Sequence, residues 1–224
     1  MSPVGDQPET LQELLEGRAK LGVAADRIAI LAPICVHENT QKLYPGLQWR
    51  NGWRNIPVDP HKDITFVDAV ISSGSLLRSD AVRDAGLPRS DFFIDYVDLE
   101  HCLRLRSKGY TIAVVRKSIL HHSQGTPRVV RFAGFSRVWA DHAPWREYYK
   151  ARNELFTVWG YQPGVAAKFS VIRRLLRHAL GVVLFGQDKL ECLKMMMLGI
   201  RDGRAGKLGI RAFAETGVSP SVTR

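Results

Sequence analysis

The sequence predicts an α/β fold followed by a basic helical region. Short apolar runs rich in β-branched residues, of which Arg27–Ala32 and Ile64–Ile71 are the clearest, indicate buried strands. Helical patterns that end at glycine separate these runs, and such alternation is typical of layered α/β folds. Beyond Pro127 the chain becomes helical and basic. We therefore expect one domain over residues 1–127 and a basic helical region over residues 128–224.

The first part of the chain is expected to hold a helix, a strand and a long loop. Residues 8–15 place a proline in the first turn and leucines at helical spacing, which predicts a short helix before the strand at Arg27–Ala32. Residues 36–62 contain Asn, Gly, Pro and three aromatic residues without periodicity, which predicts an irregular loop. Loops of this length are uncommon in compact domains unless they carry a function.

The middle of the chain alternates turns, helices and strands. The strand at Ile64–Ile71 runs into Ser72-Ser73-Gly74-Ser75, a turn of small residues that lets a ligand approach the backbone closely. The elements expected next are a helix over Ser79–Ala85 that stops at Gly86, a helix over Val97–Ser107 that stops at Gly109, a strand over Tyr110–Val115, and an extended segment Ser118–Leu120 that leads into His121-His122.

Val165–Leu184 is expected to form an amphipathic helix with two opposite faces. The apolar arc holds Phe169, Ile172, Leu175, Leu176, Ala179, Leu180 and Val183, and the cationic arc holds Arg173, Arg174 and Arg177. Two interpretations stay open: the apolar arc packs on the protein core, or it lies on an anionic lipid surface. A second helix is expected over Lys189–Ile200, where the run of methionines indicates packing rather than a cofactor site.

The net charge of +10 lies entirely in the C-terminal region. Residues 1–127 hold 15 basic and 15 acidic residues, whereas residues 128–224 hold 17 and 7. A basic surface suits nucleic acid, anionic lipid or phosphorylated substrates. Because no RNA-binding or zinc-finger pattern accompanies the charge, we expect no nucleic-acid partner.

Cysteine usage and hydropathy bear on the cellular compartment. The three cysteines are odd in number and lack CxxC spacing, which indicates reduced thiols rather than a disulfide framework or a zinc site. The polar start shows no signal peptide, and charge-free apolar runs such as Ala179–Phe185 are far shorter than the ~20 residues that span a bilayer. We expect a cytoplasmic protein that is at most peripheral on the inner face of the plasma membrane.

The chemistry is expected in the segment FFIDYVDLEHCLR, residues 92–104. Its carboxylates fall near the start of a predicted helix, where the dipole and the free N–H groups stabilise an anion. Phe92 and Phe93 exclude water, which favours the basicity that a general base needs. The alternative is that Asp95 or Asp98 only caps the helix, which is the commoner role. Residue chemistry alone leaves both interpretations open.

His122 closes the last extended segment, at the kind of loop where α/β sheets bind ligands. A histidine there is more often structural, and a metal role is the alternative. Beside a carboxylate it would help to hold Mg²⁺ or Mn²⁺, which would bind diphosphate oxygens and stabilise a nucleotide leaving group.

Four linked motifs, in this order, resemble the acceptor-side half of family 2 glycosyltransferases, which have a Rossmann-like fold called GT-A. They are VDAVISSGSLLR (residues 67–78), Gly86-Leu87-Pro88, FFIDYVDLEHCLRLRSKGY (residues 92–110) and HHSQG (residues 121–125). The likeness is strongest to bacterial rhamnosyl- and galactofuranosyltransferases, which build cell-surface polysaccharide on polyprenyl lipid carriers. Residues 144–153 and 198–209 also resemble the C-terminal region of that group, so the likeness covers most of the chain.

The resemblance implies an inverting hexosyltransferase with a nucleotide-sugar donor, UDP- or dTDP-linked, and a polyprenyl-linked or polysaccharide acceptor. In this group the carboxylate at the position of Asp98 deprotonates the acceptor hydroxyl, which displaces the nucleoside diphosphate. Glu100, and less so Asp95, would line the acceptor site. Ser73 and Gly74 would approach the donor sugar or the acceptor.

The resemblance also implies that His122 joins a divalent metal, Mg²⁺ or Mn²⁺. An anionic membrane surface is a further expected partner, because the acceptor is lipid-linked. Two interpretations stay open for Tyr148, Tyr149, Arg152 and Asn153: they contact the phosphate of the acceptor, or they belong to a structural helix.

One feature of the group is not found in this chain. Members hold the metal with an Asp-x-Asp motif at the end of an N-terminal nucleotide-binding half, and this sequence contains no Asp-x-Asp; Asp6 is a lone carboxylate. We expect that half to be missing and the sheet to expose edges beside Arg27–Ala32. A misplaced start, a degenerate fragment and a first half on a separate chain are all open. The alternative function is a catalytically inactive fragment that serves as an interaction or membrane-docking module.

Overall fold

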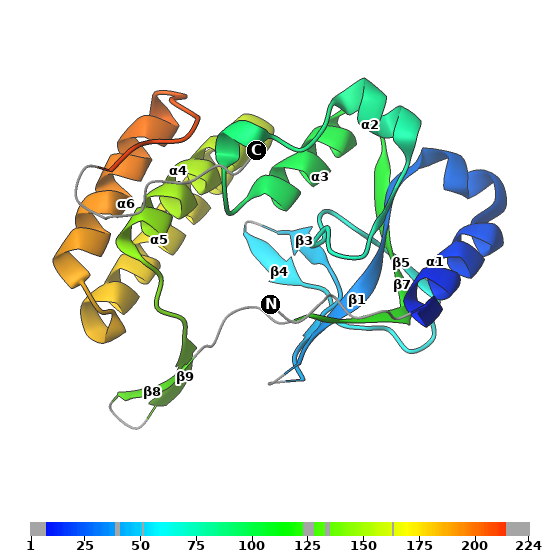
Figure 1. The fold of residues 1–224 in the computed structure, drawn as a ribbon, viewed down its shortest axis with the longest axis horizontal. Coiled ribbons are helices and arrows are strands. Elements are labelled where there is room, and N and C mark those ends of the chain that lie inside the picture. Colours follow the sequence, from blue (N-terminus) through cyan, green and yellow to red (C-terminus); the bar gives the residue numbers. More distant parts are fainter. Residues whose placement is uncertain are drawn as a thin grey trace. The chain divides into compact units, whose positions relative to one another are not determined.

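The computed structural model describes residues 8–38, 41–50, 52–122, 128–132, 135–162 and 164–213. The chain is mixed α/β, as predicted (Figure 1). It divides into two compact units, the first made of Met1–Pro88 and Asp98–Gly125 and the second of Arg89–Val97 and Thr126–Arg224. The segment Arg89–Val97 therefore groups with the C-terminal helices, although its sequence motif continues into the first unit.

The first unit is built on a five-stranded mixed sheet. Its strands are β1 (Ile28–His37), β2 (Leu43–Tyr44), β5 (Ile64–Val67), β6 (Leu76–Leu77) and β7 (Thr111–His122). The long strands β1 and β7 are parallel and lie side by side (Figure 1). β5 pairs antiparallel with the other edge of β7, and β2 and β6 pair antiparallel with the other edge of β1. The expectation of an exposed edge beside Arg27–Ala32 is therefore wrong in part, because β6 pairs with Ile30 and Leu31 on that edge and β2 pairs with Cys35 and Val36.

Helices cover both faces of this sheet. On one face, Leu14 of α1 (Pro8–Leu21) packs with Ile28 and Leu31 of β1 and with Ala113 and Val115 of β7. On the other face, α2 (Ser79–Ala85) and α3 (Val97–Ser107) pack on the side chains that alternate with these along β1 and β7. Because both faces are covered, all ten residues of β1 are buried, as is usual for parallel strands.

The predicted elements of this unit are confirmed in part. The helices over Ser79–Ala85 and Val97–Ser107 are found as predicted, and the two extended segments before His121 form the single strand β7. The loop predicted over residues 36–62 is wrong in part, since it contains the end of β1, β2 and a hairpin of β3 (Leu47–Trp49) and β4 (Trp53–Asn55). A 3₁₀ turn, η1 (Gly22–Arg27), joins α1 to β1.

The second unit is mainly helical. Its described helices are α4 (Pro144–Tyr161), α5 (Val165–Phe185) and α6 (Lys189–Arg204), which lie side by side, and a 3₁₀ turn, η2 (Ser90–Phe92), belongs to the same unit (Figure 1). The hairpin β8 (Arg128–Phe132) and β9 (Phe135–Trp139) precedes them. The C-terminal region thus contains a β-hairpin, which the sequence analysis did not predict, in addition to the expected helices.

α4 and α6 approach each other closely because α6 carries glycine at the crossing. A Cβ added at Gly199 would lie 2.3 Å from the carbonyl oxygen of Tyr148, and one at Gly203 would lie 2.7 Å from that of Arg152. Only residues without a side chain allow the two backbones to pack at this distance. The glycines of the C-terminal motif therefore have a packing role.

The face of α5 that packs on the second unit carries one residue of the predicted cationic arc, Arg174, whereas Arg173 and Arg177 are exposed. Arg174 forms an ion pair with Glu154 of α4, and Nε2 of His178 lies 2.7 Å from Oε2 of Glu147, also on α4. Most of the predicted apolar arc is exposed instead, with Leu175 as the buried exception. The interpretation in which this arc packs on the core is therefore wrong for most of its residues.

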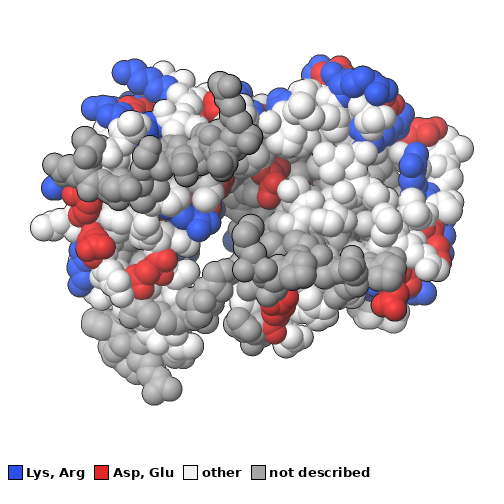
Figure 2. Space-filling view, in the orientation of Figure 1, with Lys and Arg blue, Asp and Glu red and all other residues white. Residues whose placement is uncertain are grey.

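The surface and the helices bear on the expected membrane contact. Within the described ranges, no helix combines the length and the apolarity needed to cross a bilayer. On the face that Figure 2 shows, basic and acidic side chains are interspersed and much of the described surface is uncharged. The positive charge of the chain is therefore not gathered into one patch on that face.

Candidate active site

Asp98 lies in the first turn of α3, as the sequence predicts. Its Oδ1 accepts a hydrogen bond from Oγ of Ser72 at 2.7 Å. Ser72 belongs to the turn that follows the β5 segment, so this contact joins two motifs that are 26 residues apart. The carboxylate is partly exposed and is held in a fixed direction by the hydroxyl and by the positive end of the helix dipole. The structure thus brings Asp98 to the turn that contains Ser73 and Gly74.

The turn itself is defined by Gly74. The N–H of Ser75 donates to the carbonyl oxygen of Ser72 at 3.1 Å, and Gly74 has a φ of 66° at the third position, where such turns require glycine. A Cβ at Gly74 would lie 2.9 Å from Cδ2 of Leu120. The missing side chain therefore has a conformational and a packing reason, and a contact of Ser73 or Gly74 with donor or acceptor stays a prediction.

The pKa values of two buried thiols, Cys35 and Cys102, are raised, in part by the charge of Asp98. Burial is the main cause that raises the pKa of Cys35 to about 11 and of Cys102 to about 12, and the Asp98 carboxylate raises both further. These thiols stay protonated at neutral pH, which excludes them as nucleophiles.

Glu100 lies in the interior of the first unit, where it is paired with Arg104. It is fully buried, and its two oxygens accept from Nε and Nη2 of Arg104 at 3.0 and 3.1 Å. Arg104 also donates to the carbonyl oxygens of Ala85 and Leu87, so the pair ties α3 to the end of α2. This geometry favours a structural role, and the acceptor-lining role of Glu100 stays a prediction.

Asp95 belongs to the second unit, where it pairs with Arg146 of α4. Its carboxylate accepts from Nε and Nη2 of Arg146 at 2.9 and 3.1 Å, a two-point geometry that fixes both side chains. The hydrogen bond with Asp95 raises the pKa of Arg146 above its usual range. An acceptor-binding role for Asp95 stays a prediction.

The backbone around Asp95 is strained. Phe93, Asp95 and Tyr96 have φ values of 65°, 59° and 64°, a region that residues with a side chain seldom adopt. Strain of this kind costs on the order of 1–3 kcal/mol per residue and persists only where other contacts enforce it. The contacts that enforce it here come from α4.

Asn153 and Arg152 of α4 hold this strained segment by its carbonyl groups. Nδ2 of Asn153 donates to the carbonyl oxygens of Phe92, Ile94 and Asp95 at 3.0, 2.8 and 3.0 Å. Arg152 donates through Nη2 to the carbonyl of Asp91 at 3.0 Å and through Nε to Oδ1 of Asn153 at 2.9 Å.

Both side chains have no exposed surface, so the structural interpretation of Arg152 and Asn153 is confirmed and a contact with an acceptor phosphate is excluded. Tyr148 and Tyr149 are buried beside them, where Tyr148 donates to Asp202 at 3.0 Å and Tyr149 accepts from the N–H of Arg211 at 2.9 Å. The four residues form the interior of the second unit.

The described residues do not by themselves form a metal site. Among them, no group of three or more His, Cys, Asp and Glu side chains comes together. The backbone of His122 ends β7 opposite His37, but the side chain of His122 lies outside the described residues. The metal role of His122 therefore stays a prediction. The side chain that the structure places against Asp98 is the hydroxyl of Ser72, and one carboxylate with one hydroxyl is not a typical ligand set for Mg²⁺ or Mn²⁺.

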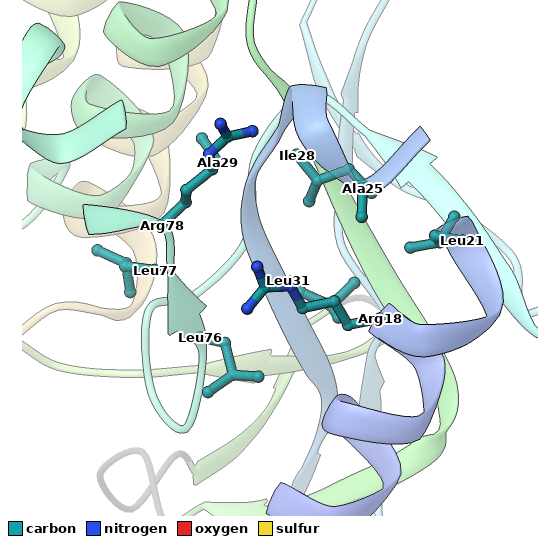
Figure 3. A pocket seen from close by; sticks show the side chains of 9 residues that line it. All are labelled: Arg18, Leu21, Ala25, Ile28, Ala29, Leu31, Leu76, Leu77 and Arg78. Atoms are coloured by element: carbon teal, nitrogen blue, oxygen red, sulfur yellow. The ribbon is translucent and has the colours of Figure 1, made fainter. Parts of the chain in front are cut away.

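Two pockets lie apart from these residues. One of about 50 Å³ lies between α1, η1, β1 and β6 and is lined by aliphatic side chains with Arg18 and Arg78 at its border (Figure 3). Arg78 is engaged there by Asp80 at 2.6 Å. The other, of about 240 Å³, belongs to the second unit and is lined by charged groups of α4 and α5 that pair with one another. None of the predicted site residues lines either pocket.

Sequence reasoning did not identify Ser72 and Arg146 as partners of the predicted residues, and it left the role of Asn153 open. Ser72, Arg146 and Asn153 contact Asp98, Asp95 and the carbonyls of the strained segment, respectively. Ser72 could have been predicted as a site residue, because it belongs to the same turn of small residues as Ser73 and Gly74. No sequence signal identifies the partners of Arg146 and Asn153, which lie 51 and 59 positions away from them.

One comparison with known proteins found a similar protein. No family model matches the chain. Over 182 residues it is 25% identical to the dTDP-rhamnosyl transferase RfbF of Shigella flexneri, an alignment that covers 80% of this chain and 60% of that protein. The chain thus spans about three fifths of the length of this relative. The similarity supports a glycosyltransferase-like relationship.

Proposed function

We propose that this chain carries the acceptor-activating part of a glycosyltransferase that moves a hexose from a nucleotide-sugar to a glycan acceptor. The observation that carries the proposal is Asp98, a partly exposed carboxylate at a helix start, hydrogen-bonded to Ser72, in a chain similar to a dTDP-rhamnosyl transferase. A rhamnose- or galactofuranose-type sugar, a UDP- or dTDP-linked donor, and a polyprenyl-linked or polysaccharide acceptor at the inner face of the membrane are the finer parts of the proposal.

In this proposal Asp98 acts as the general base. Its carboxylate takes the proton from the acceptor hydroxyl while that oxygen forms a bond to the anomeric carbon of the donor sugar. The bond from the anomeric carbon to the diphosphate breaks, the nucleoside diphosphate leaves with the electron pair, and the configuration at that carbon inverts. Ser72 supports the step by fixing the direction of the carboxylate, which matters because a base must lie within hydrogen-bond reach of the proton it removes.

No step is assigned to a metal, since the described side chains do not make a metal site. If Mg²⁺ or Mn²⁺ takes part, His122 and carboxylates outside the described residues are the ligands to examine. The ion would supply charge neutralisation of the diphosphate leaving group.

The test uses the 224-residue chain with dTDP-rhamnose, the donor suggested by the name of the relative, and with UDP-sugars as the second choice. Donor binding is measured by calorimetry and turnover by release of the nucleoside diphosphate. Asp98→Asn is expected to keep donor binding and to lower turnover by about 10²- to 10⁴-fold, the usual contribution of a general base. Ser72→Ala is expected to lower kcat by about 10- to 150-fold, because a hydrogen bond to a charged group contributes about 1.5–3 kcal/mol.

The control is Ser79→Ala, an exposed serine at the start of α2, which should leave both readouts unchanged. Loss of donor affinity in Asp98→Asn would instead make Asp98 a donor ligand and refute its role as base. If no donor at millimolar concentration gives binding heat or turnover, the result would favour the alternative, which is an inactive module that serves in interaction or membrane docking.

A further inference from the structure

We propose that the outward face of α5 is a membrane-docking surface that lies flat on anionic lipid. This inference deepens the proposed function, because a lipid-linked acceptor is part of that proposal. The observations behind it concern α5 alone. The surface is called the outer stripe and consists of Val165, Phe169, Ile172, Leu176, Leu180 and Val183.

The outer stripe is a continuous apolar line on one side of the helix. Its members follow one another at intervals of three or four residues, which places them on one face. They are exposed by between 45% and 83% of their surface, and Leu184 beside them is also exposed. At about 1.5 Å of rise per residue the line is roughly 27 Å long, far more than scattered surface leucines present.

The opposite face of α5 is already occupied by the protein. Ala167, Val171, Leu175 and Val182 are buried there. Two polar side chains on that face are held by α4, since Arg174 forms an ion pair with Glu154 and Nε2 of His178 lies 2.7 Å from Oε2 of Glu147. Rotation of the helix to bury the outer stripe would break both pairs, so the exposure of the stripe is fixed by the packing of the unit.

The charges that border the outer stripe identify the occupant. By helical position, Arg173 and Arg177 border one side and Lys168 borders the other, and α5 contains no acidic residue. Among the described residues, Arg173 and Arg177 form no ion pair. Long basic side chains beside an apolar face extend to lipid phosphates while the apolar face enters the acyl boundary.

A second copy of the chain is a poorer occupant on the same observations. Two copies packed through their outer stripes would bring the bordering cations of both helices together. Because α5 offers no carboxylate to oppose them, that contact would be repulsive. An anionic lipid surface satisfies both the apolar stripe and its basic borders.

The test is co-sedimentation of the 224-residue chain with vesicles of phosphatidylglycerol and phosphatidylcholine, compared with vesicles of phosphatidylcholine alone. Binding is expected to the anionic vesicles and to fall steeply with salt, since the Debye length shortens from about 10 Å at 0.1 M to about 3 Å at 1 M. Phe169→Gln with Leu176→Gln should lower the partition coefficient by about tenfold or more. Arg173→Gln with Arg177→Gln should lower it by roughly fivefold for each residue.

Matched controls separate this surface from general stickiness and charge. Leu87→Gln removes an equally exposed leucine in the first unit, and Arg83→Gln with Lys117→Gln removes the same charge there. The controls should bind as the parent chain does, and all variants should keep its circular dichroism spectrum because the changed side chains are exposed.

Equal loss of binding in the controls would overturn the proposal, as would equal binding to both kinds of vesicle. Absence of vesicle binding together with self-association that Phe169→Gln and Leu176→Gln abolish would overturn it too, and would make the stripe an interface between copies. No sugar substrate is present in this assay. Inactivity as a transferase with intact vesicle binding would therefore reject only the proposed function.

Discussion

Replacing Asn153 by Ala should destabilise the second unit more than any exposed substitution. The amide of Asn153 donates to three carbonyls of the strained segment and accepts from Arg152. Two amide hydrogens make about two full hydrogen bonds, worth roughly 2 kcal/mol together, and the bond from the buried guanidinium adds about 2 kcal/mol. Partial release of the backbone strain at Phe93, Asp95 and Tyr96 offsets about 1 kcal/mol. The expected loss is about 3 kcal/mol.

The loss is measured as the free energy of unfolding in urea, followed by tryptophan fluorescence and circular dichroism. Limited proteolysis with chymotrypsin provides a local readout, because the segment contains Phe92, Phe93 and Tyr96. Asn55→Ala is the matched control, since Asn55 is exposed in β4 and such changes usually stay within about 0.5 kcal/mol. A loss below about 1 kcal/mol with unchanged protease resistance would refute the reasoning that Asn153 holds the segment in its strained conformation.

Two further predictions concern packing and pH. Gly199→Ala should destabilise the chain by about 1–3 kcal/mol in urea, because its Cβ would meet the carbonyl of Tyr148. Gly160→Ala in α4 is the control: its Cβ meets no atom within 4 Å, and the change should stabilise the chain by about 0.5–1 kcal/mol. Equal effects of the two substitutions would contradict the close helix crossing. Burial, helped by the charge of Lys150, lowers the pKa of His142 to about 4. Between about pH 4 and 6.5 the unfolded state therefore binds more protons than the folded state. The free energy of unfolding keeps its full value above about pH 6.5 and falls by about 1–2 kcal/mol, after allowance for partial exposure, as the pH drops toward 4. His142→Phe should remove this component, and a His142 ring resonance that titrates near pH 6.5 would contradict it.

Local signals in the sequence identified much of the first unit. The helix over Ser79–Ala85 and the helix over Val97–Ser107 are confirmed because their apolar periodicity and their terminal glycines are encoded within each segment. The hairpins β3–β4 and β8–β9 were missed, since short strands with polar or aromatic residues carry little periodicity of their own. Their pairing is decided by contacts that single segments do not reveal.

The candidate site shows the same division. The sequence placed Asp98 in the first turn of a helix, because helix starts follow from local residue types. The contact with Ser72, the burial of Glu100 and the pairing of Asp95 with Arg146 all depend on partners distant along the chain. Such long-range partners are chosen by the packing of whole elements, which no local pattern specifies.

The clearest case is α5. The sequence alone determined that Val165–Leu184 forms a helix with an apolar and a cationic face, because a period of about 3.6 residues sorts the side chains onto two sides. It could not determine which side meets the protein. The tertiary structure decides this. Glu154 and Glu147 of α4 contact Arg174 and His178, so this side of α5 packs on the unit. Phe169 and Leu176 lie on the other side and are exposed. Periodicity fixes the faces of a helix, and the complementary charges of its neighbour fix the direction in which they point.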